Sequence, residues 1–349
     1  MFRITISDLV YRRRQFLIAT LGAGLVFAMT LLLAGLVNGF SVEINQTVSG
    51  FRADAWMVKA GSAGRVASLT PMAQSAVARA AATPGVTDAV PVVVIPQTAD
   101  VGGKLVQVNL IGAPVASAPA TQPLTSGRQV TGPHQVVVDS TLGAALGTRI
   151  TVGGRVFTVV GTTSDRTLLG GISNVYVGLA DAQAVVFQGA PIISAVIVTG
   201  NPTSAPAGLT IVTNAQIEQA SLDQMATAVS SINNSKLLMA AIAAVIVASL
   251  VYVTALERTR DFAVLKALGA SSGQLYLGLA VQAVLVALLA ALFAAVLAQF
   301  MTGVFSQPVD FAASDYVDLP VLAVVVGLLA SLIALRRAVA ADPARAFAG

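Results

Sequence analysis

The stretch "LERTRDFAVLKALGASSGQL", residues 256–275, separates two long runs of the chain that contain no charged residue. It places five charges within ten residues, at Glu257, Arg258, Arg260, Asp261 and Lys266. Runs of about 20 apolar residues are long enough to cross a bilayer as helices. The charges between two such runs therefore predict a turn that lies in water between two membrane helices.

The composition of the whole chain is typical of a membrane protein. Of its 349 residues, 56% are hydrophobic and only 10% are charged, and the mean hydropathy is +0.81. A soluble domain carries about 25% charged residues. The chain has no cysteine, which excludes disulfides, thiolate metal sites and cysteine nucleophiles.

Four segments are apolar and long enough to span a membrane, at 16–40, 237–256, 275–302 and 319–335. The first follows three consecutive arginines, as the core of a signal peptide would. Its apolar stretch is longer than the roughly 7–15 residues of such a core, and no cleavage site follows promptly. We therefore predict that it is a retained membrane helix.

Basic residues predict the orientation of these helices. Lysines and arginines gather in residues 1–15, 257–274 and 336–349, whereas the loop 303–318 carries aspartates and no basic residue. The positive-inside rule then puts both termini and the 257–274 loop in the cytosol, and residues 41–236 outside. We expect a multi-pass protein of the bacterial cytoplasmic membrane, with the net charge of +4 in cytosolic loops and no nucleic-acid surface.

The outside segment reads as short β-rich runs punctuated by glycine and proline, with short helices between them. The clearest run is "TRITVGGRVFTVVG", residues 148–161, which predicts a hairpin with a two-residue turn at Gly153 and Gly154. From about 215 to 239 the sequence is helical and has no glycine or proline. We predict a helical stalk there, continuous with the second membrane helix.

The predicted fold class is an α-helical membrane protein with four transmembrane helices and a large α+β extracytoplasmic domain between the first and second helices. Its predicted parts are an amphipathic interfacial helix (1–15), the first membrane helix (16–40), the extracytoplasmic domain (41–236) with its stalk (about 215–236), the second membrane helix (237–256), a cytosolic loop (257–274), the third membrane helix (275–302), a short outer loop (303–318), the fourth membrane helix (319–335) and a cytosolic tail (336–349).

Reactive groups are scarce in this sequence. His134 is the single histidine, and without a second histidine or a thiol it does not predict a zinc site. No G-x-x-x-x-G-K-[ST] motif is present, which excludes nucleotide binding by a P-loop. The predicted spans contain no acid or base, which disfavours an ion-coupled carrier. We predict no catalytic, cofactor-binding or metal-binding residue in this chain and interpret His134 as a surface loop residue.

Two pairs of residues predict contacts with other helices or proteins. Phe262 and Leu265 share one face of the helix predicted to end at Gly269, and an exposed apolar pair at a charged tip favours docking to a partner surface. Gly35 and Gly39 form a small-x-x-x-small face late in the first helix. Such a face suits close helix packing, either within the chain or between two copies of it.

The segment "ERTRDFAVLKALGAS", residues 257–271, resembles the cytosolic motif of FtsX-like and MacB-like ABC transporter permeases of the mechanotransmission class. The matching residues are Glu257, Arg258, Arg260, Leu265, Lys266, Ala267, Gly269, Ala270 and Ser271, with Asp261 in place of the usual glutamate. Three further stretches resemble the same family: "ISDLVYRRRQF" (6–16), "HQVVVDSTLGAALGTRITVGGRVFTVVGT" (134–162) and "DPARAF" (342–347).

The resemblance implies a permease subunit that works with a separate cytosolic ABC ATPase, which would bind the ATP and magnesium. It implies two permeases with two ATPases, and an extracytoplasmic domain with porter-like parts at about 46–100 and 180–225 around an inserted β-rich part at about 100–180. By that analogy Phe262, Leu265 and Gly269 fit a groove of the ATPase. The predicted coupling residues are Glu257, Arg258, Arg260, Asp261, Phe262, Leu265, Lys266 and Gly269.

The function expected from the resemblance is coupling of ATP hydrolysis on the partner to movement of the stalk and extracytoplasmic domain, in export or mechanotransmission. One alternative is an import permease for a small solute such as an amino acid, which predicts a polar pocket between the helices. Another is an ATP-independent envelope scaffold or regulator of a cell-wall hydrolase. Expected partners besides the ATPase are an envelope protein or lipoprotein and membrane lipid.

Overall fold

The structure, a computed structural model, describes residues 13–257, 264, 269, 271–304, 307 and 309–338. The chain divides into two compact units. The helical unit comprises Met1–Asn38 and Ala228–Gly349, and the α+β unit comprises Gly39–Thr227. Residues 1–12 of the predicted interfacial helix (1–15) lie outside the described residues.

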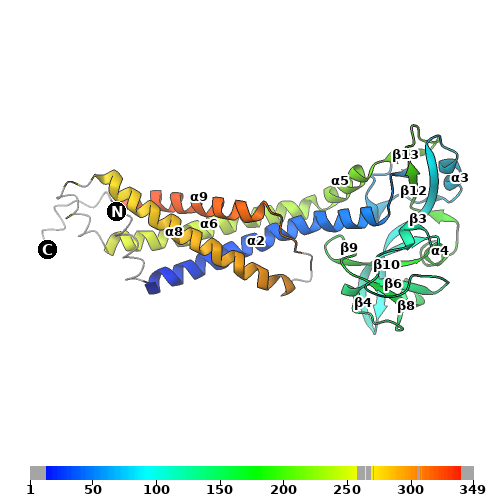
Figure 1. Ribbon diagram of the computed structural model, residues 1–349, viewed down its shortest axis with the longest axis horizontal. Helices are drawn as coiled ribbons and strands as arrows, with labels where there is room; N and C mark the ends of the chain where they lie inside the picture. Colours follow the sequence, from blue (N-terminus) through cyan, green and yellow to red (C-terminus); the bar gives the residue numbers. More distant parts are fainter. Residues whose placement is uncertain are drawn as a thin grey trace. The chain divides into compact units, whose positions relative to one another are not determined.

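Four long helices supply the helical unit (Figure 1). They are α2 (Arg13–Gly50), α6 (Ala226–Glu257), α8 (Ser272–Met301) and α9 (Asp315–Ala338), with a short 3-10 turn η4 (Thr302–Val304) after α8. Each is long and apolar enough to cross a membrane, over Phe16–Gly50, Ala226–Glu257, Leu277–Met301 and Asp315–Leu332. This confirms the predicted four membrane helices, with the α+β domain between the first and the second.

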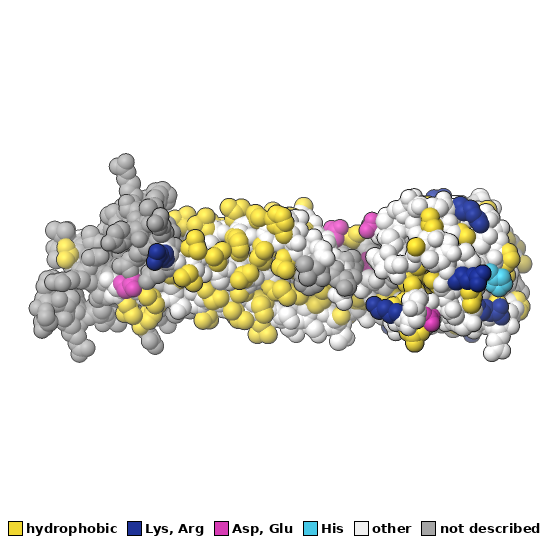
Figure 2. Space-filling model, turned by 90° about the horizontal axis from the view of Figure 1, so that it is seen from below, with side chains coloured by type: hydrophobic (Ala, Val, Ile, Leu, Met, Phe, Trp, Pro, Cys, Tyr) yellow, Lys and Arg dark blue, Asp and Glu magenta, His cyan; other side chains and the backbone are white. Residues whose placement is uncertain are grey.

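Small residues let these helices pack closely. Seven alanines of helix α8 are buried inside the unit: Ala280, Ala283, Ala287, Ala290, Ala291, Ala294 and Ala298. At the contact with α9, a Cβ on Gly327 would lie 2.9 Å from the Cα of Val284, so only glycine fits there. Large apolar side chains such as Leu237 and Leu292 point outward, and hydrophobic side chains cover the visible face of the helices (Figure 2). This inside-small, outside-apolar arrangement is typical of helices packed in lipid.

A mixed sheet dominates the α+β unit, and one long strand, β3 (Val86–Val101), joins its two halves. Its first residues pair with β12, as in Val92 with Ala195, and its later ones with β4, as in Val94 with Ile111. The first half contains β1 (Ala55–Lys59), β12 (Ala195–Gly200) and β13 (Leu209–Val212); the second contains β4 (Lys104–Ala113), β5 (Ser126–Gly127), β6 (Gln135–Asp139), β7 (Arg149–Val152), β8 (Arg155–Thr163), β9 (Thr167–Leu168) and β10 (Ile172–Gly178).

Shorter elements complete the unit. Strands β2 (Met72–Ala73) and β11 (Ile192–Ile193) form a separate pair. The helices are α3 (Ala76–Ala81), α4 (Leu179–Val186) and α5 (Asn214–Gln224), and the 3-10 turns are η1 (Val66–Ser68), η2 (Ala118–Ala120) and η3 (Ser140–Leu142). Segments from the two ends of the unit's sequence thus form one half of the sheet, and the middle of the sequence forms the other.

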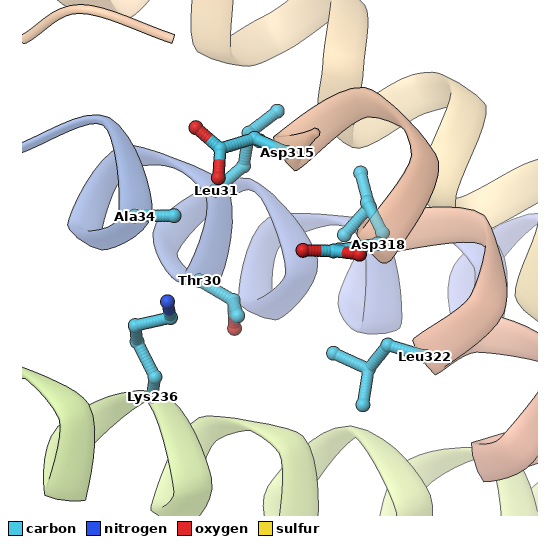
Figure 3. Close-up of a pocket in the computed structure, with 8 residues that line it drawn as sticks. Thr30, Leu31, Ala34, Lys236, Asp315, Asp318 and Leu322 are labelled. Carbon is cyan, nitrogen blue, oxygen red and sulfur yellow. The ribbon is translucent and has the colours of Figure 1, made fainter. Parts of the chain in front are cut away.

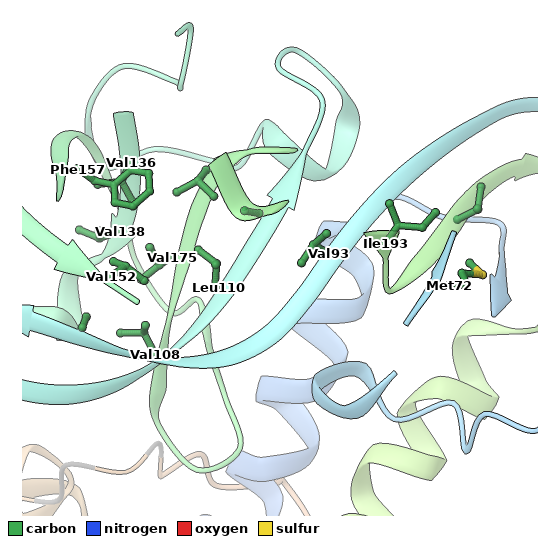
Figure 4. Close-up of a cluster of buried hydrophobic side chains, with 14 of the residues drawn as sticks. Met72, Val93, Val108, Leu110, Val136, Val138, Val152, Phe157, Val175 and Ile193 are labelled. Carbon is green, nitrogen blue, oxygen red and sulfur yellow. The ribbon is translucent and has the colours of Figure 1, made fainter. Parts of the chain in front are cut away.

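Both faces of this sheet are buried. In β3, Val93 belongs to one hydrophobic cluster, whereas Val92 and Val94 belong to another on the opposite face. The first cluster also contains Phe157 of β8 (Figure 4). The second includes Ile44 from the end of α2. Because successive strand residues point to opposite faces, burial on both sides explains why these strands read as unbroken apolar runs.

The predicted hairpin at Gly153 and Gly154 is confirmed. Strands β7 and β8 pair antiparallel, with Val152 opposite Arg155. Both turn glycines have positive φ, 53° and 82°. Two positive φ values at the central residues match the twist of the strands and favour glycine at both positions.

The helix predicted through residues 215–239 is interrupted at Met225. Helix α5 ends at Gln224, and the Met225 N–H turns back to the carbonyl of Leu222 (2.8 Å). No breaker residue causes this stop. Helix α5 is instead anchored to the α+β unit, where Ser221 Oγ accepts the N–H of Val66 (3.2 Å) and Ile217 is fully buried. Tertiary contacts therefore end the helix where propensity alone would continue it.

Replacing each turn glycine with alanine should separate strain from crowding. Gly154 has open space where a Cβ would stand, whereas a Cβ on Gly153 would lie 2.5 Å from Val185 Cγ1. We expect Gly154→Ala to cost about 1 kcal/mol of unfolding free energy from left-handed strain. Gly153→Ala should cost about 1–3 kcal/mol more from overpacking. Trp56, the chain's one tryptophan and fully buried in the α+β unit, reports this unfolding by fluorescence in the full-length protein. Equal losses in the two variants would contradict the packing against Val185.

Candidate functional site

The predicted coupling segment begins where α6 ends and finishes where α8 begins. Of the predicted coupling residues, the structure describes Glu257, the last residue of α6, and Gly269. The others lie outside the described residues: Arg258, Arg260, Asp261, Phe262, Leu265 and Lys266. Within the segment, Val264 is helical and 46% exposed.

One glycine and one capping serine define the turn into α8. Gly269 has φ +93°, a backbone conformation that favours glycine. Ser271 caps α8 because its hydroxyl accepts the Gln274 N–H (3.3 Å), while the Gln274 side chain accepts the Ser271 N–H (3.1 Å). This reciprocal capping box satisfies two of the backbone donors that every helix start leaves open. The described ends of the segment therefore show where α6 ends and where α8 begins.

Close packing within the chain accounts for Gly35. A Cβ there would lie 2.8 Å from both Phe311 Cδ1 and Val309 Cγ1, in the stretch before α9. The Gly35 carbonyl also accepts the Asp310 N–H (3.0 Å). One turn later, Asn38 donates its side-chain amide to the Asp310 carbonyl (3.1 Å). Of the two alternatives for the Gly35–Gly39 face, contact within the chain is therefore present at Gly35, and dimerisation stays a prediction.

A buried carboxylate, absent from the sequence predictions, holds the end of α2 within the α+β unit. Glu43 is 3% exposed and accepts the backbone N–H groups of Gly170 (2.8 Å) and Gly171 (2.7 Å). Leu169, Gly170 and Gly171 all have positive φ, which turns consecutive N–H groups toward one concavity. We call this arrangement the Glu43 clamp.

Further hydrogen bonds extend the clamp along α2. Arg166 donates to the Gln46 carbonyl (2.8 Å), and the Thr47 hydroxyl donates to the Thr167 carbonyl (2.9 Å). Asn174 of β10 donates to Thr47 Oγ1 (3.2 Å), and Asn109 of β4 donates to Asn174 Oδ1 (3.2 Å). Two turns of α2 are therefore tied to the second half of the sheet. In the sequence, the spacing of Glu43 and Thr47 by one helical turn was the available signal.

His134 lies in the turn that precedes β6. It has φ 56°, its N–H donates to Asp181 Oδ2 (2.9 Å), and its ring lies 6.2 Å from that of Phe157. Among the described residues, no group of three or more histidine, aspartate or glutamate side chains is arranged to hold a metal ion.

Comparison with known families matches nearly the whole chain. The MacB-like periplasmic core domain matches residues 16–230, and the FtsX-like permease C-terminal domain matches residues 236–343. Curated relatives described as uncharacterized ABC transporter permeases come from Mycobacterium bovis and Mycobacterium tuberculosis. They are 41% identical over 344 residues, covering 99% of this chain and 98% of the relative. A second permease of Mycobacterium tuberculosis is 37% identical over the same length.

Among solved structures, the periplasmic region of MacB from Actinobacillus actinomycetemcomitans is similar to this chain at 17% sequence identity, with a TM-score of 0.36. The match covers 50% of this chain and 96% of that one.

Alanine substitution of two glycines of α2 tests the packing at Gly35. Nothing lies within 4 Å of a Cβ at Gly22, so Gly22→Ala should be neutral or gain up to about 1 kcal/mol from helix propensity. Gly35→Ala should lose about 1–3 kcal/mol because its Cβ meets Phe311. The measurement is thermal unfolding of the full-length protein in detergent, with mass determined by light scattering. A Gly35→Ala variant that unfolds like Gly22→Ala, but dissociates a dimer, would favour the intermolecular alternative instead.

Removing the Glu43 carboxylate should loosen the α+β unit. Glu43→Ala leaves two N–H groups without their acceptor, at about 1–3 kcal/mol each. Glu218→Ala is the matched control, because Glu218 accepts one hydrogen bond at an exposed position, from Asn45, and should cost no more than about 0.5 kcal/mol. Urea unfolding followed by Trp56 fluorescence measures both. If the two variants unfold at the same urea concentration, the clamp does not stabilise the unit.

Proposed function

Because the chain belongs to the ABC transporter permeases of the FtsX and MacB type, we propose that it couples ATP hydrolysis on a separate cytosolic ATPase to movement of the α+β unit. The protein is a multi-pass membrane protein with an extracellular domain. In this proposal both termini and the 257–274 segment face the cytosol, as the basic residues predict. Two permeases and two ATPases form the working complex.

The observation that carries this proposal is the continuity of α2. The helix starts in the helical unit and runs without interruption to Gly50, inside the α+β unit. Its last turns are held there by the Glu43 clamp and by Ile44 and Val48 in the hydrophobic core. In the proposed mechanism, α2 passes movement from the helical unit to the α+β unit along one continuous helix.

The polar side chains of the membrane spans support movement over conduction of a polar solute. The hydroxyls of Thr30, Thr254 and Ser331 donate to carbonyls of their own helices, at Val26 (3.0 Å), Leu250 (2.9 Å) and Leu328 (2.7 Å). Gln282 differs from these residues, since its buried Nε2 has no partner. A path for a hydrated solute needs side chains that offer hydrogen bonds to it, and these hydroxyls are already engaged.

The force in this mechanism enters at the coupling segment. The chain lacks a P-loop, so the energy of ATP has to come from a partner chain. Phe262 and Leu265 supply the apolar contact with that partner, and Glu257, Arg258, Arg260, Asp261 and Lys266 hold the tip in its shape or form ion pairs with the partner. Helix α6 is continuous from Ala226 to Glu257, which links the tip to the start of the span.

Charged substitutions at the tip test this coupling. Phe262→Glu combined with Leu265→Glu puts two charges on the apolar pair, so we expect at least a tenfold loss of the ATPase that co-purifies with the full-length permease. ATP hydrolysis by the purified complex should fall in proportion. Membrane insertion and the Trp56 fluorescence of the α+β unit should stay unchanged, because neither residue belongs to that unit.

Val264→Glu is the control for the effect of charge at the tip, since it adds one such charge at an exposed position between the two residues. At 100° per residue of the predicted helix, position 264 falls away from the face on which the sequence places Phe262 and Leu265. It should retain the ATPase. If the double variant keeps the ATPase at the unmodified level, the coupling role of this segment is wrong.

A further inference from the structure

A cavity of about 230 Å³ opens between three helices of the helical unit. We call it the lateral cavity, and its lining residues come from α2, α6 and α9: Thr30, Leu31, Ala34, Lys236, Asp315, Asp318, Leu319 and Leu322. Figure 3 shows Lys236 reaching from α6 toward α2, with the carboxylates of Asp315 and Asp318 on the α9 side. Four of the eight lining residues are apolar, and the other four are polar or charged.

The charged side chains that line the lateral cavity are not paired with one another. In the described part of the chain, no ion pair or hydrogen bond joins Lys236 to Asp315 or Asp318, although all three line the same space. Asp315 Oδ2 accepts the Ala312 N–H (2.9 Å), which leaves its other oxygen available. Opposite charges that face one cavity without pairing leave donors and acceptors for a ligand.

The cavity lies where the apolar stretches of two helices begin. Lys236 directly precedes the uncharged run 237–256, and Asp318 directly precedes the run 319–335. The next residues of α6, Leu237 and Leu238, are 71% and 63% exposed. In a bilayer, the boundary between charged and lipid-exposed apolar residues falls at the level of the lipid headgroups.

The mixture of charges selects the ligand. A divalent cation meets the ammonium of Lys236, and a simple anion meets two carboxylates, so each is repelled by part of the lining. A group that carries one negative and one positive charge matches both sides. The cavity volume is below the roughly 300–1,000 Å³ of a pocket for a drug-sized molecule, so it holds a headgroup and not a whole lipid.

We infer that the lateral cavity binds the zwitterionic headgroup of an amphiphile, with its anionic group at Lys236 and its ammonium group at Asp315 and Asp318. The apolar chains then follow Leu319 and Leu322 out onto the lipid-exposed faces of the helices. This inference deepens the proposed function and rests on it for the fate of the ligand, because binding itself requires only the permease chain.

Native mass spectrometry of the full-length permease in detergent, without the ATPase, tests the inference. The probes are phosphatidylethanolamine as the zwitterionic amphiphile, phosphatidylglycerol as the anionic one, and glycerophosphoethanolamine as the headgroup without chains. We expect at least fivefold more retained phosphatidylethanolamine than phosphatidylglycerol, and no retained glycerophosphoethanolamine at the same concentration. Equal retention of the two lipids, or equal binding of the free headgroup, would overturn the assignment to a zwitterionic amphiphile.

Two variants locate the site. Lys236→Ala and Asp318→Asn should each lower phosphatidylethanolamine retention about tenfold, whereas Lys104→Ala, an exposed lysine of the α+β unit, should leave it unchanged. Thermal unfolding shows whether either variant is misfolded. If one is, lipid retention by the other variant tests the site. Unchanged retention in a folded Lys236→Ala or Asp318→Asn protein refutes the site. Co-purification of the ATPase with the same variants is a separate readout, so loss of coupling and loss of lipid binding are distinguishable.

Discussion

The carboxylate of Glu43 accepts two backbone N–H groups from a glycine turn, and the hold of the α+β unit on α2 depends on this contact. A buried charge is costly unless hydrogen bonds replace its water. Gly170 and Gly171 supply these bonds only in a left-handed backbone conformation that favours glycine. The turn and the helix therefore stabilise each other. The bonds from Thr47 to Asn174 and on to Asn109 extend this contact from the helix into the sheet.

The two helices that cross the boundary between the units differ in their continuity. Helix α2 passes through it without a break, whereas α6 is separated from α5 at Met225. Helix α5 is fixed to the sheet at its start, where Asn214 accepts the Trp56 indole N–H (2.7 Å) and donates to the Ala53 carbonyl (2.8 Å). A non-helical residue between two helices can take up a change of backbone angle. In the proposed mechanism, α2 carries the movement and Met225 accommodates it.

Local features were predictable from the sequence because their causes are local. A long apolar run indicates a membrane helix, and two adjacent glycines between strand patterns indicate a hairpin turn. A serine three residues before a glutamine indicates the start of a helix. The role of β3 is different, because its partners Ala195 and Gly112 lie far apart in the sequence and belong to different halves of the sheet. The stop at Met225 likewise follows from packing of α5, and Glu43 reads as one more polar helix residue until its turn is known. The charges of the lateral cavity flank separate spans, so only the folded bundle brings them together.

Helix α2 also connects the lateral cavity to the α+β unit. Thr30, Leu31 and Ala34 form one wall of the cavity, and Glu43, on the same helix, is tied to the sheet. A ligand that prefers one position of α2 therefore favours one position of its anchored end. By thermodynamic linkage, a partner that favours one position of that end changes the affinity of the cavity for its ligand. The ligand changes the affinity for the partner by the same factor. In the proposed mechanism, an ATPase that acts on residues 257–274 releases a headgroup in this way at the membrane surface, and no solute passes between the four helices.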